Sequence, residues 1–234
     1  MYFQVILGRK TNDKTVEYNS AVRIMTKEYY RRNLPHWHPP NSVFALTYNL
    51  EGSIPKHILE QLKNEKAFQI KNLKEKGIEG YELQEELNKL QSLYFGKYDD
   101  LLDNPKNDIQ YFKNPKVAKV VQDSLEYLND KVWKMVCYCI MSNHVHLIVY
   151  KLNQPLTKTL QSHKRHTAVK SNEILGSEGK FWQRETFDRK IRNRKEFGNQ
   201  VRYAVFNPVK AGLVEKWQDW KYTWIREEYE YLIK

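Results

Sequence analysis

Two apolar runs, at residues 132–141 and 145–150, are separated by only Ser142 and Asn143. Such a pair is typical of two sheet strands joined by a short bend. A further strand is predicted at residues 42–50, where apolar and polar side chains alternate. A chain with this pair of strands in its middle must build its core around a sheet, with its helices packed on that sheet.

Amphipathic helices flank the two central strands. Asn114 and Pro115 have the order of a helix cap followed by proline, and they predict a helix that ends near Asp130. A second, strongly basic helix is predicted from Pro155 to about residue 174, where glycines end it. Each of these helices follows a predicted strand, so strands and helices alternate along the chain.

The last part of the chain adds two more elements. Residues 181–191 are interpreted as a short strand or extended segment, and residues 194–206 as a helix that stops before Pro208. The order strand, helix, strand, strand, helix, strand is that of a split βαβ unit. We therefore expect an α+β fold, a ferredoxin-like (RRM-like) sandwich whose antiparallel sheet has one open face.

Polar segments interrupt and precede this core. After Pro55 the chain is crowded with Lys, Glu, Gln, Asn and Leu, with leucines near helical spacing, which predicts an inserted helical hairpin. The expected organisation is an N-terminal extension at residues 1–33, one domain at 34–226 with a helical insertion at about 56–110, and a C-terminal tail at 227–234.

Positive charge is concentrated in the second half of the chain. Residues 131–234 carry 20 Lys and Arg against 10 Asp and Glu, whereas residues 1–130 carry 19 against 18. A solvated basic surface would explain these numbers without a ligand. Together with 16 Tyr, 9 Phe and 6 Trp, they favour nucleic acid, because phosphates attract cations and unpaired bases stack on aromatic rings.

No apolar stretch approaches the ~20 residues of a membrane helix, and the first residues lack the features of a secretory signal. We expect a cytoplasmic, nucleoid-associated protein with no membrane partner. Cys137 and Cys139 lie two apart in an apolar run, so we expect small buried thiols rather than a disulfide.

His144 and His146 are two apart on a predicted strand, so both imidazoles point from the same face. Two ligands side by side on a rigid strand suit a metal site, which needs a third ligand from elsewhere. The alternative is a pair of half-exposed surface histidines.

Tyr203 and Asn207 are four apart and therefore lie on one helix face, one turn from each other. A tyrosine beside a metal-polarised phosphate could attack a phosphodiester, and the amide oxygen of Asn207 could be a metal ligand. The alternative is that Tyr203 is an ordinary helix residue and that Asn207 and Pro208 only end the helix.

Three motifs occur in order: MSNHVH at residues 141–146, FWQRE at 181–185, and Tyr203 followed by NPVKAGLV at 207–214. Together they resemble the single-tyrosine HUH transposases, the IS200-like group. LPHW at 34–37 and SIP at 53–55 narrow the resemblance to the REP-associated tyrosine transposases. The resemblance extends over residues 34–224, apart from the insertion.

The resemblance implies a fold, an activity and a site. It implies that His144 and His146, with Asn207, hold a divalent ion, Mg²⁺ or Mn²⁺, and that Tyr203 forms a 5′-phosphotyrosine link to single-stranded DNA. The expected substrate is single-stranded DNA that folds into a REP-like hairpin. The protein would then be a metal-dependent endonuclease and strand transferase, as a monomer or a dimer.

The densest basic stretch follows the two histidines and is expected to bind DNA, although any one of its residues could simply be solvated. Its members are Lys158, Lys164, Arg165, His166, Lys170, Arg184, Arg189, Lys190, Arg192 and Arg194. A rival function on the same fold is a non-catalytic regulator that binds hairpins. The formation of a covalent DNA adduct separates the two functions.

Overall fold

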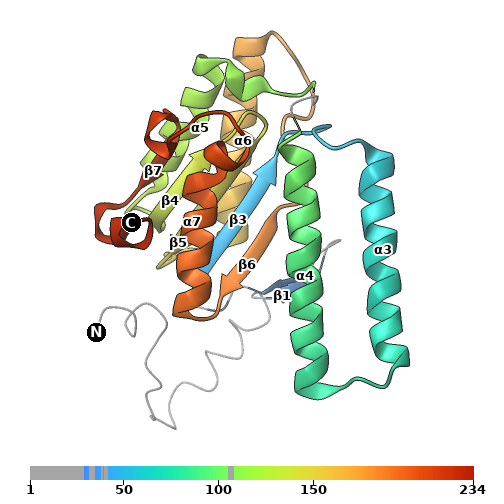
Figure 1. Cartoon of the computed structure of the whole chain (residues 1–234). Coiled ribbons are helices and arrows are strands. Elements are labelled where there is room, and N and C mark those ends of the chain that lie inside the picture. Colours follow the sequence, from blue (N-terminus) through green and yellow to red (C-terminus); the bar gives the residue numbers. More distant parts are fainter. Residues whose placement is uncertain (1–28, 32–34, 38, 40–41, 105–107) are drawn as a thin grey trace.

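The computed structural model describes residues 29–31, 35–37, 39, 42–104 and 108–234 (Figure 1). The predicted N-terminal extension therefore lies outside the described residues, apart from β1 (Tyr29–Arg31). This short strand pairs antiparallel with β2 (Pro35–Trp37).

The centre of the protein is a five-stranded antiparallel sheet with the order β6-β3-β5-β4-β7. Its strands are β3 (Val43–Asn49), β4 (Lys134–Ile140), β5 (His144–Tyr150), β6 (Phe187–Ile191) and β7 (Thr223–Ile225). The four strands from β6 to β4 have the predicted split βαβ arrangement, with the adjacent runs forming β4 and β5. The edge strand β7 was not predicted, because three residues give too short a pattern.

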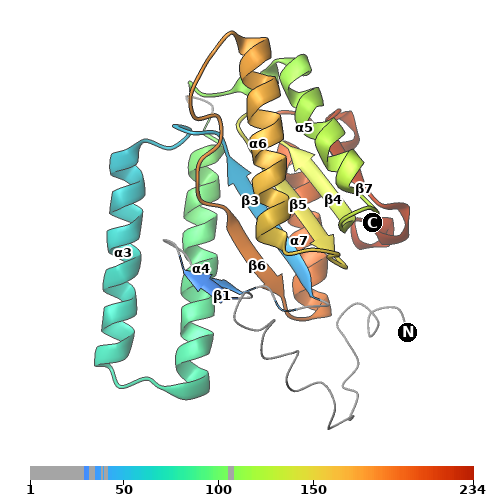
Figure 2. The same ribbon diagram turned by 180° about the vertical axis from the view of Figure 1, so that it is seen from behind.

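Helices pack on both faces of the sheet (Figures 1 and 2). α5 (Pro115–Leu128) and α6 (Leu156–Leu175) cover one face, where they enclose a core that includes Leu46, Leu147 and Val149. α7 (Arg194–Lys210) lies on the opposite face over Val136 and Ile148. The face expected to be open therefore carries α7, which brings that helix against the side of β5 that holds both histidines.

Local sequence signals fix where these helices begin and end. The Asn114 side chain accepts a hydrogen bond from the backbone N–H of Lys116, as predicted for the start of α5. Gly176 ends α6 with a φ of +61°, a left-handed conformation that glycine adopts without strain.

The prediction that α7 stops before Pro208 was wrong. The helix continues to Lys210, because a proline in the last turn removes only one backbone donor. The Ala211 and Leu213 N–H groups close the end by donating to the carbonyls of Asn207 and Pro208, both at 2.9 Å. Tyr203, Asn207 and Lys210 therefore belong to one continuous helix.

A helical hairpin separates β3 from α5, as expected. It consists of α3 (Lys56–Glu75) and α4 (Gly80–Leu102). No residue of α3 is buried, whereas α4 buries four side chains near its C-terminal end, among them Tyr98 and Asp99. The Tyr98 hydroxyl donates to Asn49 Oδ1 at 2.8 Å, and Asn143 Nδ2 donates to the Leu102 carbonyl at 3.0 Å. These contacts fix the end of α4 on the sheet.

Short elements complete the fold: η1 (Tyr111–Lys113), η2 (Trp217–Asp219) and η3 (Glu227–Leu232). η3 lies in the segment expected as a tail, and its Tyr229 is buried against Phe197 of α7. Cys137 and Cys139 are free and buried, as predicted. Within the described part of the chain, none of the helices has the length and apolar character that crossing a membrane requires.

Candidate active site

His144 and His146 project from the α7 side of β5, and their Nε2 atoms lie 3.0 Å apart. The two residues are only 1% and 3% exposed, so the alternative of half-exposed surface histidines is wrong. Burial lowers the pKa of both imidazoles. The rings are therefore neutral at pH 7, which is the form that binds metals.

The second nitrogen of each ring has a partner that orients it. His144 Nδ1 lies 2.7 Å from Asn143 Oδ1, and His146 Nδ1 lies 2.9 Å from Thr47 Oγ1 on the neighbouring strand. A proton on Nδ1, donated to these oxygens, leaves the Nε2 lone pair free. Metal-binding histidines are typically oriented by such hydrogen bonds.

Asp99, from the inserted helix α4, offers a third candidate ligand, whereas the sequence analysis expected Asn207 in that role. Its Oδ1 lies 3.4 Å from His146 Nε2 and 3.9 Å from His144 Nε2. The ligand atoms of the three residues all lie within 4.8 Å of one another. Asp99 is fully buried, yet its Oδ1 has no hydrogen-bond partner among the described residues. An unpaired buried carboxylate oxygen facing two imidazole nitrogens fits a divalent cation.

A second carboxylate, that of Asp103, lies about one helical turn beyond Asp99, directly after the end of α4. Asp103 Oδ1 is 3.9 Å from His144 Nε2 and is also without a hydrogen-bond partner in the described structure. Burial, and then the neighbouring charge of Asp99, raise the pKa of Asp103 to about 6. Burial also acts to raise the pKa of Asp99, but the histidines, a hydrogen bond from Tyr203 and Lys210 outweigh it and lower that pKa. Asp99 is therefore ionised at pH 7.

Tyr203 lies directly beside this group. Its hydroxyl donates a hydrogen bond to Asp99 Oδ2, and its ring centroid lies 5.6 Å from that of His146. Burial, followed by the charge of Asp99, raises the pKa of the phenol above its ordinary value. The phenol is therefore protonated at pH 7, and Asp99 Oδ2 accepts the hydrogen bond that it donates.

Asn207 also reaches the site, but with its nitrogen. Asn207 Nδ2 donates to Asp99 Oδ2 at 3.3 Å, while Oδ1 is buried without a hydrogen-bond partner among the described residues. The structure thus brings together His144, His146, Tyr203 and Asn207, the four residues expected at the catalytic centre. Asp99 touches or approaches all four of them.

No protein-family model matches the chain. A Haemophilus influenzae protein assigned to the REP-associated tyrosine transposases is 30% identical over 102 residues, which cover 39% of this chain and 58% of that relative. This match confirms the resemblance to the REP-associated tyrosine transposases. The chain thus spans little more than half the length of the relative, whose activity and partners extend to this chain only as proposals.

Among solved structures, a REP-associated tyrosine transposase bound to a REP hairpin is similar over 83% of this chain and 80% of that chain. Its TM-score is 0.43 and its sequence identity is 16%.

The basic residues predicted to bind DNA fall into two groups. The first group belongs to α6, which lies on the opposite face of the sheet from α7, the helix that carries Tyr203 (Figure 2). Its exposed members are Lys158, Arg165, His166 and Lys170. Lys164 is only partly exposed, and its Nζ donates to the Gln183 and Glu185 carbonyls and to Thr186 Oγ1 at 2.7–3.3 Å. α6 and Tyr203 are therefore on opposite sides of the sheet, and the role of α6 in DNA binding stays a prediction.

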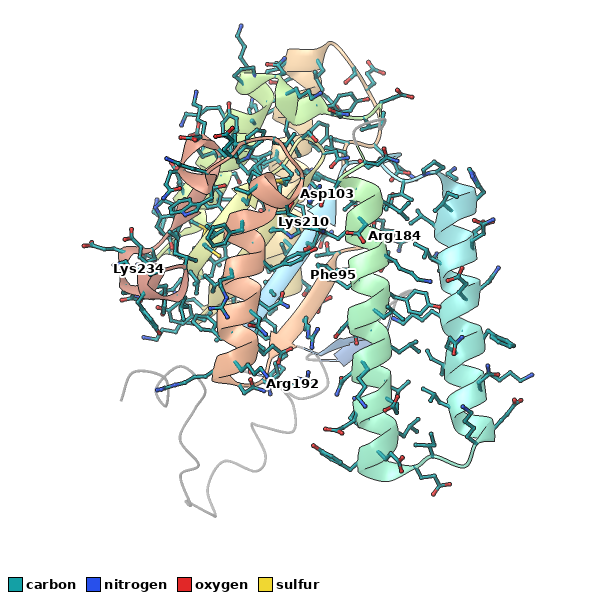
Figure 3. All side chains as sticks on the ribbon, in the orientation of Figure 1. Phe95, Asp103, Arg184, Arg192, Lys210 and Lys234 are labelled. Carbon is teal, nitrogen blue, oxygen red and sulfur yellow. The ribbon has the colours of Figure 1, made fainter. Side chains whose placement is uncertain are left out.

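The second group follows α6 and lies along β6 and the start of α7. Arg189 and Arg192 both pair with Glu196, at 2.6 and 3.1 Å, and Arg192 lies at the lower end of α7 in Figure 3. Arg184 and Arg194 are exposed, and Lys190 is partly buried. DNA binding by these residues also stays a prediction.

Proposed function

We propose that the protein is a metal-dependent endonuclease and strand transferase that acts on single-stranded DNA hairpins through a covalent bond to Tyr203. The observation that carries the proposal is the position of Asp99. One oxygen of this buried carboxylate faces His144 and His146, and the other accepts the hydrogen bond of Tyr203. The nucleophile and the candidate ion site therefore share one side chain.

The residues that would hold the ion are His144, His146 and Asp99, with the free Oδ1 of Asn207 as an additional ligand. A carboxylate together with two imidazoles suits Mn²⁺ or Mg²⁺, and imidazole also suits zinc. A divalent ion held by these residues would polarise the scissile phosphate and offset the charge that develops on it.

The reaction follows from the contacts of Tyr203. Its oxygen attacks phosphorus while its proton moves to Asp99 Oδ2, the oxygen that already accepts the hydrogen bond. A tyrosine–phosphorus bond forms as the bond from phosphorus to the 3′-oxygen breaks, and the departing 3′-oxygen takes a proton from solvent water to become a 3′-hydroxyl. One phosphodiester is exchanged for another, so the strand can be rejoined without a nucleotide cofactor.

A small cleft lies beside the site. It lies between α4, α7 and the β3–β6 edge, and its lining includes Gln91, Phe95, Phe187 and Gln200. Phe95 also packs on Tyr203, with ring centroids 5.9 Å apart. Aromatic rings and amides next to a nucleophile suit unpaired bases, which stack and form hydrogen bonds.

The wider setting is part of the same proposal. Residues 34–226 would form the HUH domain, with its insertion at about 56–110, and the protein would act in the cytoplasm on nucleoid DNA. The net charge of residues 131–234 suits a phosphate-rich partner.

The test is to trap the adduct. The protein is incubated with Mn²⁺ and labelled single-stranded hairpins from the flanks of its own coding region, and the products are separated in denaturing gels. Wild-type protein and Tyr231→Phe, a change at an exposed tyrosine, should form a labelled adduct, and Tyr203→Phe should not. DNA binding without any adduct would favour the non-catalytic regulator, and an adduct in Tyr203→Phe would refute the assignment of the nucleophile.

A further inference from the structure

We propose that Lys210 is a further catalytic residue, whose ammonium contacts the phosphate that Tyr203 attacks; the inference rests on the proposed function. Lys210 belongs to the NPVKAGLV motif. Its position in the structure gives it a chemical role.

α7 presents three functional groups in a row. Tyr203, Asn207 and Lys210 are spaced four and three residues apart, so they lie on one face of the helix. Lys210 Nζ lies 3.5 Å from Tyr203 Oη and 5.3 Å from the centroid of its ring. The ammonium is therefore next to the oxygen that forms the new bond.

Lys210 lies at the entrance to the site. Its side chain is 42% exposed, whereas Asp99 beneath it is fully buried. Lys210 and Asp103 lie close together in the gap between α7 and α4 (Figure 3). A phosphate bound at Tyr203 Oη would therefore lie beside this ammonium. With phosphorus about 3 Å from the phenolic oxygen, as in a near-attack geometry, a phosphate oxygen comes within hydrogen-bonding distance of Nζ.

The charges around Lys210 leave it available for such a contact. Its Nζ lies 3.5 Å from Asp99 Oδ2, 2.9 Å from Asp100 Oδ1 and 3.3 Å from Asp103 Oδ2. Three carboxylates and one ammonium leave two negative charges, which a divalent ion at Asp99 would neutralise. With those charges neutralised, the ammonium can pair with an incoming phosphate instead of with the carboxylates.

The experiment uses a hairpin substrate with a neutral methylphosphonate at the scissile position, compared with the normal phosphodiester. Lys210→Ala should lower single-turnover cleavage of the phosphodiester by about 100-fold, the usual cost of losing one such contact. It should lower cleavage of the methylphosphonate by less than tenfold, because the charge that Lys210 neutralises is missing. Lys210→Arg should retain most of the activity.

Lys195→Ala is the matched control. Lys195 is exposed on the first turn of the same helix, about 22 Å from Lys210 at the helical rise of ~1.5 Å per residue. Its removal should change both rates by less than twofold.

A binding measurement gives a readout that does not depend on cleavage. In the Tyr203→Phe background, the phosphodiester hairpin should bind more tightly than the methylphosphonate hairpin, and Lys210→Ala should remove that difference. Equal losses of cleavage on both substrates, no loss at all, or a binding difference that survives Lys210→Ala would each overturn the inference. If the analogue is not cut, the binding comparison decides. Absence of any adduct with wild-type protein would refute the proposed function instead.

Discussion

Replacing Asp99 by Asn should remove most of the stabilisation that Mn²⁺ gives to the folded protein, with little change in the metal-free protein. Asp99 is the charged member of the group with His144 and His146. Losing the charged ligand should cost at least about 100-fold in affinity, because losing a hydrogen-bond partner of a metal ligand already costs up to about 100-fold. In EDTA, the lost pairing with Lys210 is offset by the removal of a buried charge.

The magnitude follows from ligand linkage. With free Mn²⁺ at 100 times the wild-type Kd, binding stabilises the fold by about 2.7 kcal/mol; a 100-fold weaker site leaves about 0.4 kcal/mol. For a chain of 234 residues, 1 kcal/mol corresponds to roughly 2–4 °C in Tm. Mn²⁺ should therefore raise Tm by about 5–11 °C in wild-type protein and by only about 1–2 °C in Asp99→Asn.

The assay is thermal unfolding of metal-stripped protein with and without MnCl₂. Asp100→Asn is the matched control, because Asp100 is the next residue of α4 and its side chain is 70% exposed. The control should keep the wild-type Mn²⁺ shift. A full shift in Asp99→Asn, together with its loss in Asn207→Ala, would refute the assignment of Asp99 and leave Asn207 as the third ligand.

Three further predictions address the histidines, acid stability and DNA binding. His144→Ala and His146→Ala should each abolish the Mn²⁺ shift, and EDTA should stop cleavage until Mn²⁺ or Mg²⁺ is restored; cleavage that continues in EDTA would exclude a metal-dependent reaction. His163 is buried and forms hydrogen bonds with Ser124 and Tyr48, and burial lowers its pKa to about 3, below its ordinary 6.5. The folded protein therefore keeps this histidine neutral, which stabilises the fold above pH 6.5. That contribution is lost as the pH falls below 6.5, because the histidine of the unfolded chain then takes up a proton. In urea unfolding, the free energy of unfolding of wild-type protein should fall by about 2 kcal/mol more than that of His163→Gln between pH 6.5 and 5. Equal falls in the two proteins would contradict this prediction. Single-stranded hairpins should bind at least about tenfold better than duplex DNA. The double variant Lys158→Ala, Arg165→Ala should reduce the slope of log affinity against log salt concentration by about 1.4. An unchanged slope in a salt titration would mean that DNA does not contact the exposed side of α6.

The sequence predicted the parts of the site that depend on local geometry. Strand alternation placed His144 and His146 on one face, and helical spacing placed Tyr203 one turn before Asn207. The resemblance to the transposases linked these two pairs across the chain. Prediction failed at Pro208, where a strong stop signal lies in the last turn and costs the helix only one hydrogen bond.

Asp99 could not be predicted, because its role depends on tertiary packing. It lies in a polar segment whose composition indicates a solvated hairpin, and α3 is indeed without buried residues. Only the packing of Tyr98 and Leu102 against the sheet carries the adjacent carboxylate to the histidines. A local signal exists in Asp99, Asp100 and Asp103 on one helix end, but acidic helix residues are usually solvated.

The most direct test of the account is a crystal structure of the protein grown with Mn²⁺, with anomalous diffraction recorded at the manganese edge. We expect one strong peak at about 2.0–2.3 Å from His144 Nε2, His146 Nε2 and Asp99 Oδ1, the usual range for such ligands. A peak bound to the histidines and Asn207 but distant from Asp99, or no peak at β5, would contradict it.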